Sequence, residues 1–273
     1  MTVDAGAMAR EIAAAYDARV AIQPLSSRGD GLDLASAYAV ESDLARAREA
    51  AGHRKVGLKV GYANKAVWRA LKLKTLVWAH MYDDTVRFAE ANLASIPVSQ
   101  TMAPKIEPEI VFKLRSSIPT GTTDPAEALG SVEWLALGFE IIDSVYPDWK
   151  FRPEDFVAAF GLHRALIVGA PLMVTADNQS ALAAALPTFS VSLSRDDVPV
   201  ATGSGKNSLG SPALCLIELA AAVERTPRAT PLGAGALVSS GTLTESQPMG
   251  TGQTWRAELA GLDLPPLTLR TIG

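Results

Sequence analysis

The chain has 273 residues, enough for one large or two small domains with a sizeable core. It is 48% hydrophobic and 20% charged, which excludes an extended disordered protein. Lys and Arg number 25 against 29 Asp and Glu, and this net charge of −4 argues against a nucleic-acid partner. A single cysteine, Cys215, excludes an internal disulfide and a thiolate zinc cluster, so any metal must use oxygen or nitrogen ligands.

The apolar runs are too short to indicate a membrane partner. The longest, over residues 165–176, contains a Gly and a Pro and falls short of the roughly 20 residues that a spanning helix needs. Asp4, Arg10 and Glu11 interrupt the region where a signal peptide needs a basic start and an unbroken apolar stretch. We therefore expect a cytoplasmic protein.

Residues 1–55 are expected to form a helical segment, with helices over 7–20 and 33–52 and a loop at 26–31. The second helix is capped by the Asp at its start. From Val56 onward, short alternating runs separated by Gly, Pro, Asp and Ser predict a mixed sheet. We predict that this helical segment and the sheet-based remainder, residues 56–273, form one continuous structural unit.

Three later elements have clear local signals. Period-two alternation predicts a β-hairpin over residues 189–201 that turns at Asp196–Asp197. Ser211 before a proline predicts the N-cap of a buried helix over 212–223. Alternation returns at 267–272 and predicts a C-terminal strand.

The sharpest chemical feature is a pair of carboxylates two residues apart. In a strand, Glu107 and Glu109 share one face at a spacing of about 7 Å. Like charges held together need a cation or a proton, and Mg²⁺ and Mn²⁺ favour carboxylate oxygens. A divalent metal is the economical interpretation. The alternative left open is a solvated edge strand, which Pro108 permits.

Two further charged side chains lie in apolar surroundings. Glu140 is flanked by apolar residues and needs a cationic partner if it is buried, whereas Asp143 is expected to cap a turn with Ser144. In the strand-like run 55–61, glycines flank Lys59 on one face and would let a ligand approach it. Lys59 is thus a candidate acid/base or charge stabiliser, unless it is simply solvated.

The Gly-rich stretch 203–210 contains a Gly-Lys pair but lacks the spacing of a nucleotide-binding loop and of the dinucleotide fingerprint. What remains is a loop that enters a helix N-terminus, where backbone N–H groups can hold a carboxylate. Of the three histidines, His53, His80 and His163, each alone is expected to be a hydrogen-bonded structural residue.

Six short stretches, in order and over about residues 30 to 270, resemble the 2-keto-4-pentenoate hydratase and 4-oxalocrotonate decarboxylase group of the fumarylacetoacetate hydrolase superfamily. They are residues 57–61, 107–109, 139–144, 148–150, 202–205 and 238–242. The resemblance implies an α/β (α+β) fold, namely a mixed β-roll of the fumarylacetoacetate hydrolase type with a helical N-terminal segment, and a homo-oligomer. It also implies that residues 56–273 form the catalytic domain.

The resemblance also implies a site. Its acidic triad falls on Glu107, Glu109 and Glu140, which would bind Mg²⁺ or Mn²⁺, and its active-site lysine falls on Lys59. Family members chelate a 2-oxo or 2-hydroxydienoate acid through its carboxylate and C2 oxygen, so the metal would stabilise enolate charge. The loop around Ser204 and Gly205, with Gly241 and Thr242, is expected near the substrate carboxylate.

The chain departs from the family pattern at two places. His80 stands where the hydratases carry an acidic residue, and His163 lies in a segment where the family has an Asn- and Ser-rich turn. We hypothesise that the two histidines form a replacement pair for proton transfer or substrate binding. A changed acid/base set could redirect an enolate toward decarboxylation, C–C hydrolysis or tautomerisation.

The resulting expectation is a metal-dependent lyase, a hydratase of an aromatic-degradation pathway that adds water to a small 2-hydroxy-2,4-dienoate. A 2-oxo acid decarboxylase or a C–C bond hydrolase on the same scaffold is the alternative among enzymes. A catalytically silent relative that binds a ligand through the retained fold is the alternative outside them.

Overall fold

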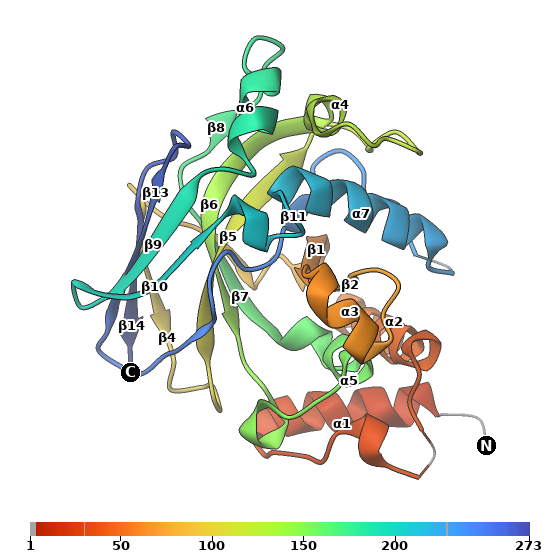
Figure 1. Cartoon of the computed structure of the whole chain (residues 1–273). Coiled ribbons are helices and arrows are strands. Elements are labelled where there is room, and N and C mark those ends of the chain that lie inside the picture. The colour runs from red at the N-terminus through yellow and green to blue at the C-terminus, as the bar shows by residue number, and fades with distance from the viewer. Residues whose placement is uncertain (1–3, 30, 228) are drawn as a thin grey trace.

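The computed structural model describes residues 4–29, 31–227 and 229–273. Within them, two sheets and a set of helices pack around continuous apolar layers (Figure 1). The long sheet runs β2 (Val77–Tyr82), β1 (Lys55–Gly61), β11 (Leu237–Ser239), β5 (Lys105–Leu114), β6 (Val132–Ile142), β7 (His163–Val168), β3 (Val86–Phe88), with β12 (Gln247–Pro248) beside β5 and β8 (Leu172–Met173) beside β6. The second runs β10 (Val198–Ser204), β9 (Ser190–Arg195), β13 (Thr254–Ala260), β14 (Leu267–Ile272), β4 (Leu93–Pro97).

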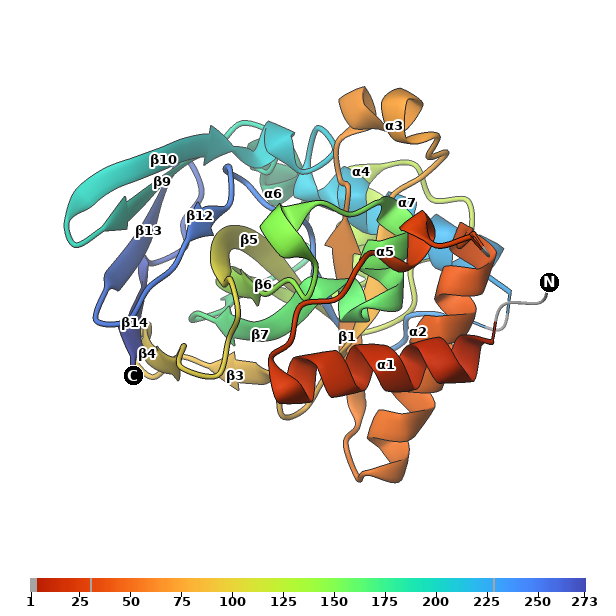
Figure 2. The same ribbon diagram turned by 90° about the horizontal axis from the view of Figure 1, so that it is seen from below.

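The helices lie on different sides of the long sheet. They are α1 (Ala5–Ala18), α2 (Leu34–Ala50), α3 (Lys65–Leu71), α4 (Pro125–Gly130), α5 (Pro153–Ala158), α6 (Gln179–Ala185) and α7 (Pro212–Arg225). The second sheet and the pair α1 and α2 lie at opposite ends of the molecule (Figure 2). In the part of the chain that the structure describes, no helix has the length and apolarity to cross a membrane.

Side-chain alternation in β5 assigns the two faces of the long sheet. Ile110 and Phe112 point into the main core, which they share with Leu216 and Leu219 of α7, whereas Val111 belongs to a smaller cluster on the other face. By the same period of two, Glu107 and Glu109 lie on the face opposite the main core. The core therefore fixes the strand without surrounding its carboxylates.

The expected elements form close to their predicted bounds. Asp33 caps α2 by accepting a hydrogen bond from the N–H of Ser36, and Ser211 caps α7 in the same way. The hairpin β9–β10 turns at Asp196 and Asp197, both with positive φ, a conformation that Asp tolerates. Of the predicted loop at 26–31, Asp30 lies outside the described residues.

The edge-strand alternative for the Glu-Pro-Glu segment is wrong. β5 lies inside the sheet, between β6 on one side and β11 and β12 on the other. Pro108 is accommodated because it falls between the segment of β5 that pairs with β12, residues 105–106, and the segment that pairs with β11, residues 111–113. The carboxylates of β5 are therefore held in the interior of a sheet.

The contact between β1 and β11 requires a glycine at position 57. A Cβ added to Gly57 would lie 1.9 Å from the carbonyl oxygen of Leu237, an atom fixed by the sheet. We expect Gly57→Ala to cost about 3 kcal/mol of unfolding free energy or more, and thermal denaturation should show Tm lowered by roughly 6–12 °C. Gly233→Ala is the control, since its Cβ would meet no atom within 4 Å. Equal Tm values for the two variants would contradict this packing.

Candidate functional site

Strand pairing brings four charged side chains from three strands to one place. Glu107 of β5 pairs directly with Glu140 of β6 in the register, and Lys59 of β1 pairs with Ser239 of β11, which contacts Glu109. One carboxylate oxygen from each glutamate lies within 4.8 Å of the others. The predicted triad and the predicted lysine are thus brought together, although they come from distant parts of the chain.

Glu109 is completely buried and only half satisfied. Its Oε2 accepts hydrogen bonds from the hydroxyl of Ser239 at 2.5 Å and from the N–H of Gly241 at 2.9 Å. Its Oε1 has no partner among the described residues. Gly241 has a φ of +89°, and a Cβ there would lie 2.8 Å from the side chain of Ala63, so only glycine presents this N–H easily.

Glu140 and Lys59 form a buried ion pair. The ammonium of Lys59 lies 3.0 Å from Oε2 of Glu140, donates a hydrogen bond to the carbonyl of Gly161 at 2.9 Å and lies 4.7 Å from the ring centre of Phe156. Lys59 is 2% exposed, so it is not the solvated strand lysine of the alternative interpretation. Gly161 has a φ of +60°, and a Cβ there would meet the Lys59 side chain at 2.8 Å.

The glycines beside Lys59 serve packing rather than ligand access. The space of a Cβ on Gly61 is filled by the ring of Phe156, whose atoms would lie 2.4 Å away, and Gly57 makes room for the backbone of Leu237. The expectation that these glycines open the lysine to a ligand is therefore wrong for both positions. The effect of Gly61 on the lysine is indirect, because the Phe156 ring for which it makes room lies over the ammonium.

Burial and charge set the protonation of the three glutamates. Burial, reinforced by the charge of Glu140, raises the pKa of Glu107 to about 7 and holds the pKa of Glu109 well above its usual range. Burial also opposes ionisation of Glu140, but Lys59 and His163 together outweigh it and lower the pKa of Glu140. One charge is balanced by Lys59 and two remain to be neutralised.

These features fit a divalent cation. Oε1 of Glu109 is buried and accepts no hydrogen bond from the described residues, which leaves its lone pairs available for an ion. Oε2 of Glu140 has the ammonium of Lys59 as its partner at 3.0 Å. Three converging carboxylates are the hard oxygen donors that Mg²⁺ and Mn²⁺ prefer. Both the carboxylate donors and the uncompensated negative charge of the site therefore favour a divalent cation.

A cavity of about 550 Å³ opens beside these residues. Lys59 and Glu107 line it together with Gly241 and Thr242, which were expected near the substrate. Ser204 and Gly205 do not line it, and their predicted role in substrate binding stays a prediction. The space of a Cβ on Gly205 is taken by the carbonyl oxygen of Leu186, so this glycine permits close packing of two backbone segments.

Asn207, Glu245 and Ser246 line the cavity but were not predicted. Each lies in a connecting segment close to a predicted motif. Nothing in the local sequence distinguishes these polar residues from ordinary loop residues, so only the folded chain identifies them.

The expectation that Asp143 caps a turn with Ser144 is wrong, because its carboxylate accepts hydrogen bonds from the N–H groups of Met102 and Ala103, 41 and 40 positions away. In the local turn it is the hydroxyl of Ser144 that accepts from the N–H of Tyr146.

The structure does not bring His80 or His163 to this cavity. Nδ1 of His163 lies 2.9 Å from Oε1 of Glu140 and its Nε2 lies 3.0 Å from the hydroxyl of Thr85, so it contacts the triad without lining the cavity. Nδ1 of His80 lies 2.6 Å from Glu41. Both histidines line a second cavity of about 260 Å³. Their predicted role in proton transfer stays a prediction, without a contact to the first cavity to support it.

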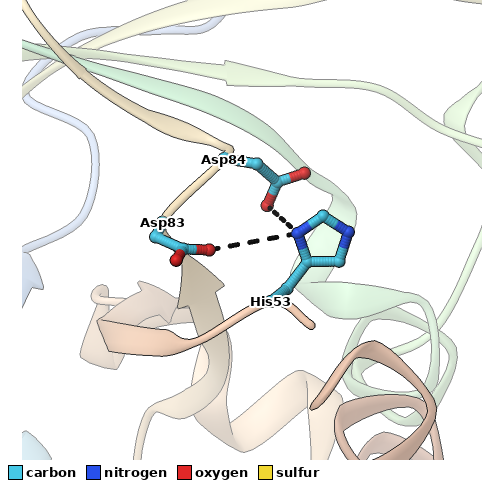
Figure 3. Close-up of side chains that lie close together, drawn as sticks. All are labelled: His53, Asp83 and Asp84. Carbon is cyan, nitrogen blue, oxygen red and sulfur yellow. Dashed lines mark ion pairs between the residues drawn. The ribbon is translucent and has the colours of Figure 1, made fainter. Parts of the chain in front are cut away.

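The third histidine belongs to a separate cluster, shown in Figure 3. Nδ1 of His53 lies 3.9 Å from Asp83 and 3.4 Å from Asp84. Arg54 pairs with Asp83 at 3.0 Å and Arg48 pairs with Asp84, so the two acidic charges already have cationic partners. This cluster therefore needs no ion to balance its charge.

Removing one ligand tests the metal site. We expect Mg²⁺ or Mn²⁺ to raise the Tm of the protein, and Glu109→Gln to abolish that rise while changing the metal-free Tm by only a few degrees, because the amide oxygen can still accept from Ser239 and Gly241. Glu133→Gln, which alters a half-buried glutamate paired with Lys113, is the control and should keep the rise. A metal-dependent shift retained in Glu109→Gln would exclude this residue as a ligand.

The raised pKa values predict a pH dependence. The pKa of Glu107 is raised to about 7 in the folded protein from its ordinary value of 4.5, so between these two pH values the native state binds more protons than the unfolded chain. The metal-free protein should then lose stability as the pH rises from about 4.5 to about 7. Because a bound metal ion replaces those protons, we expect it to raise the Tm more at pH 8 than at pH 6. Denaturation at several pH values measures this, and Glu107→Gln should flatten the dependence.

No protein-family model matches the chain. It is 29% identical to a 2-keto-4-pentenoate hydratase of Paraburkholderia xenovorans over 88% of this chain and 86% of that one. It is also 29% identical to a 4-oxalocrotonate decarboxylase of a Pseudomonas species over 88% of each chain.

Among solved structures, the 4-oxalocrotonate decarboxylase of Pseudomonas putida G7, complexed with magnesium and adipate, superposes with a TM-score of 0.86 at 24% identity and covers 98% of this chain and 97% of that one. A yeast fumarylacetoacetate hydrolase family protein superposes with a TM-score of 0.56 at 14% identity over 81% and 93%. The chain therefore has the mixed α/β fold of this superfamily, and its predicted resemblance to the hydratase and decarboxylase group is confirmed.

Proposed function

We propose that the protein is a divalent-metal-dependent lyase that adds water to a 2-hydroxy-2,4-dienoate. The observation that carries the proposal is the convergence of Glu107, Glu109 and Glu140 beside Lys59 at the wall of one cavity. The similarity to named hydratases, at 26–29% identity over most of the chain, supports the choice of reaction.

The three glutamates would hold Mg²⁺ or Mn²⁺. A divalent ion bound there supplies a Lewis acid for the carboxylate and C2 oxygen of a chelating acid. The rest of the site consists of residues that this fold already fixes. Three contacts immobilise Lys59, with Glu140, Gly161 and Phe156, so its ammonium can stabilise negative charge on a bound acid and exchange a proton with it.

Substrate oxygens need donors that the fold leaves free. The N–H of Gly241 already donates to Glu109, and the hydroxyl of Thr242 donates to the carbonyl of Thr244, so neither is the best anchor despite its place on the cavity wall. Asn207 also lines the cavity and uses one of its two amide hydrogens on the carbonyl of Leu243. We propose its second hydrogen as a donor to the substrate.

A 2-oxo acid decarboxylase is the second candidate. The specific observation in its favour is the equal identity, 29%, to a curated 4-oxalocrotonate decarboxylase. The same glutamates and the same lysine would serve both reactions, because both pass through enolate charge at the end of the substrate that carries the 2-oxo acid. Assembly into a homo-oligomer and the other predictions about cellular context stay predictions from the sequence.

A direct assay tests the reaction. Purified protein with Mg²⁺ should consume 2-hydroxypenta-2,4-dienoate by water addition, without release of CO₂, and Lys59→Met should lower kcat by at least ~10²-fold. Lys113→Met, which alters a half-buried lysine of the same sheet that does not line the cavity, should keep the wild-type rate. The metal-induced rise in Tm should persist in Lys59→Met, which shows that the loss is not one of folding or metal binding.

The possible outcomes separate the candidates. CO₂ release from an oxo-diacid would favour the decarboxylase, and a chain cleavage product would favour the C–C bond hydrolase. Metal binding without turnover of any of these acids would favour a silent relative that binds a ligand. A near-native kcat in Lys59→Met would remove this lysine from the mechanism.

A further inference from the structure

A second cavity, of about 260 Å³, is separate from the one beside the triad. The two cavities share no lining residue. The wall of the second comes from the helices α1 and α2, the strands β2 and β7 and the segments next to them. The proposed reaction uses no group from this cavity, so a ligand held by its wall would be bound outside the site of the reaction.

Two buried hydrogen-bond donors on this wall have no partner. Tyr82 is 2% exposed, and its hydroxyl makes no hydrogen bond within the described residues. Nε of Arg48, whose guanidinium lies 4.7 Å from the ring centre of Tyr82, is buried and unpartnered as well. Unpaired buried donors are rare in folded proteins because they lose their hydrogen bonds to water and gain none in return. Two of them side by side indicate a place for a hydrogen-bond acceptor that the chain itself does not supply.

The charges on the wall leave room for one negative charge. The three histidines that line the cavity each lie beside a carboxylate: His53 beside Asp83 and Asp84, His80 beside Glu41, and His163 beside Glu140. Arg48 pairs with Asp84, whereas Arg164 has no ion pair among the described residues. The acid on the wall is Asp17, which is exposed, so water and salt screen its charge. Arg164 therefore remains as the cation for a monoanion.

The rest of the wall is apolar and partly aromatic. The rings of Tyr16 and Phe160 meet edge to face with centroids 6.1 Å apart, and Leu44 and several alanines complete this side. The volume lies just below the roughly 300–1,000 Å³ of pockets that hold drug-sized ligands, so the cavity fits a small molecule. A hydrocarbon body would be buried against these side chains, whereas inorganic phosphate would leave them wet and would carry more charge than one arginine balances.

We infer that the second cavity is a binding site for a small monocarboxylic acid with an aromatic or short aliphatic body. The hydroxyl of Tyr82 and Nε of Arg48 donate hydrogen bonds to its carboxylate, and Arg164 supplies the positive charge that the other groups leave unbalanced. The body packs against Tyr16 and Phe160. This binding requires neither the metal ion nor the proposed reaction.

Titration of the metal-free protein with benzoate tests the inference. With a chelator present, the three glutamates of the triad hold no ion and repel an acid from the first cavity, so calorimetry of the full chain reports the second. We expect one benzoate per chain with a Kd of ~1 mM or tighter. Benzamide, a neutral molecule of nearly the same shape, should bind at least ~10-fold more weakly because it lacks the charge.

Variants of the wall locate the bound acid. Tyr82→Phe and Arg164→Met should each weaken benzoate binding by ~10-fold, and Asp17→Asn should tighten it by removing a negative charge. Tyr62→Phe, the same change at a tyrosine of the first cavity, is the matched control and should keep the wild-type affinity. Because the Tyr82 hydroxyl has no partner, Tyr82→Phe should keep the wild-type Tm, which separates a loss of binding from a loss of folding.

Three results would overturn the inference. The first is an absence of benzoate binding up to ~10 mM, well above the expected Kd. The second is equal affinity for benzamide, which would show that the cavity does not recognise a carboxylate. The third is an affinity that is unchanged in Tyr82→Phe and Arg164→Met but lost in Lys59→Met, because the acid would then lie in the first cavity.

Discussion

Three carboxylates converge on one point with a single ammonium to balance them, and the surrounding structure is arranged around this excess of negative charge. Lys59 offsets the charge of Glu140, which is the glutamate whose pKa is lowered. Glu107 and Glu109 have no such partner and keep their protons to higher pH. A site of this kind is stable when its glutamates are partly protonated or when they bind a cation, and binding of the cation releases the protons.

The packing of the sheet holds the carboxylates together against their mutual repulsion. β1, β5 and β6 hold the charged side chains on one face, while their other face is fixed by the main core, in which Ile110, Phe112 and Phe139 are fully buried. Because every apolar contact on the core side opposes separation of the strands, the carboxylates cannot move apart to relieve their repulsion. A rigid scaffold of this kind keeps ligands in position before the ion arrives.

Sequence patterns predicted the parts of the structure that depend on neighbouring residues. The caps at Asp33 and Ser211 and the shared face of Glu107 and Glu109 follow from local spacing. The partners of the site do not, since Lys59 contacts the carbonyl of Gly161, 102 positions away, and Glu109 contacts Ser239, 130 positions away. Residue type indicated which side chains carry charge, but only the strand registers decide what neutralises them.

The same argument explains the expectation about the glycines, which the structure changed, and the surroundings of His163. Gly57 and Gly61 have the local appearance of a ligand approach, yet the backbone of Leu237 and the ring of Phe156 occupy the space that they leave. His163 lies next to a departure from the family pattern, and its imidazole contacts Glu140. In both cases the local sequence marked the region, and a long-range contact that it could not indicate decides what the residue touches.

The two ends of the substrate explain how one set of glutamates could serve more than one reaction. The triad and Lys59 act on the carboxylate and C2 oxygen, which hydratase and decarboxylase substrates have in common. What differs between those substrates lies at the far end, where a dicarboxylic acid needs a cation and a monocarboxylic acid does not. In this chain, the cavity wall carries the carboxylate of Glu245 and the rings of Trp149 and Phe151 besides the triad and Lys59. The triad and Lys59 are therefore compatible with either reaction, and it is the rest of the cavity wall that has to distinguish the two kinds of substrate.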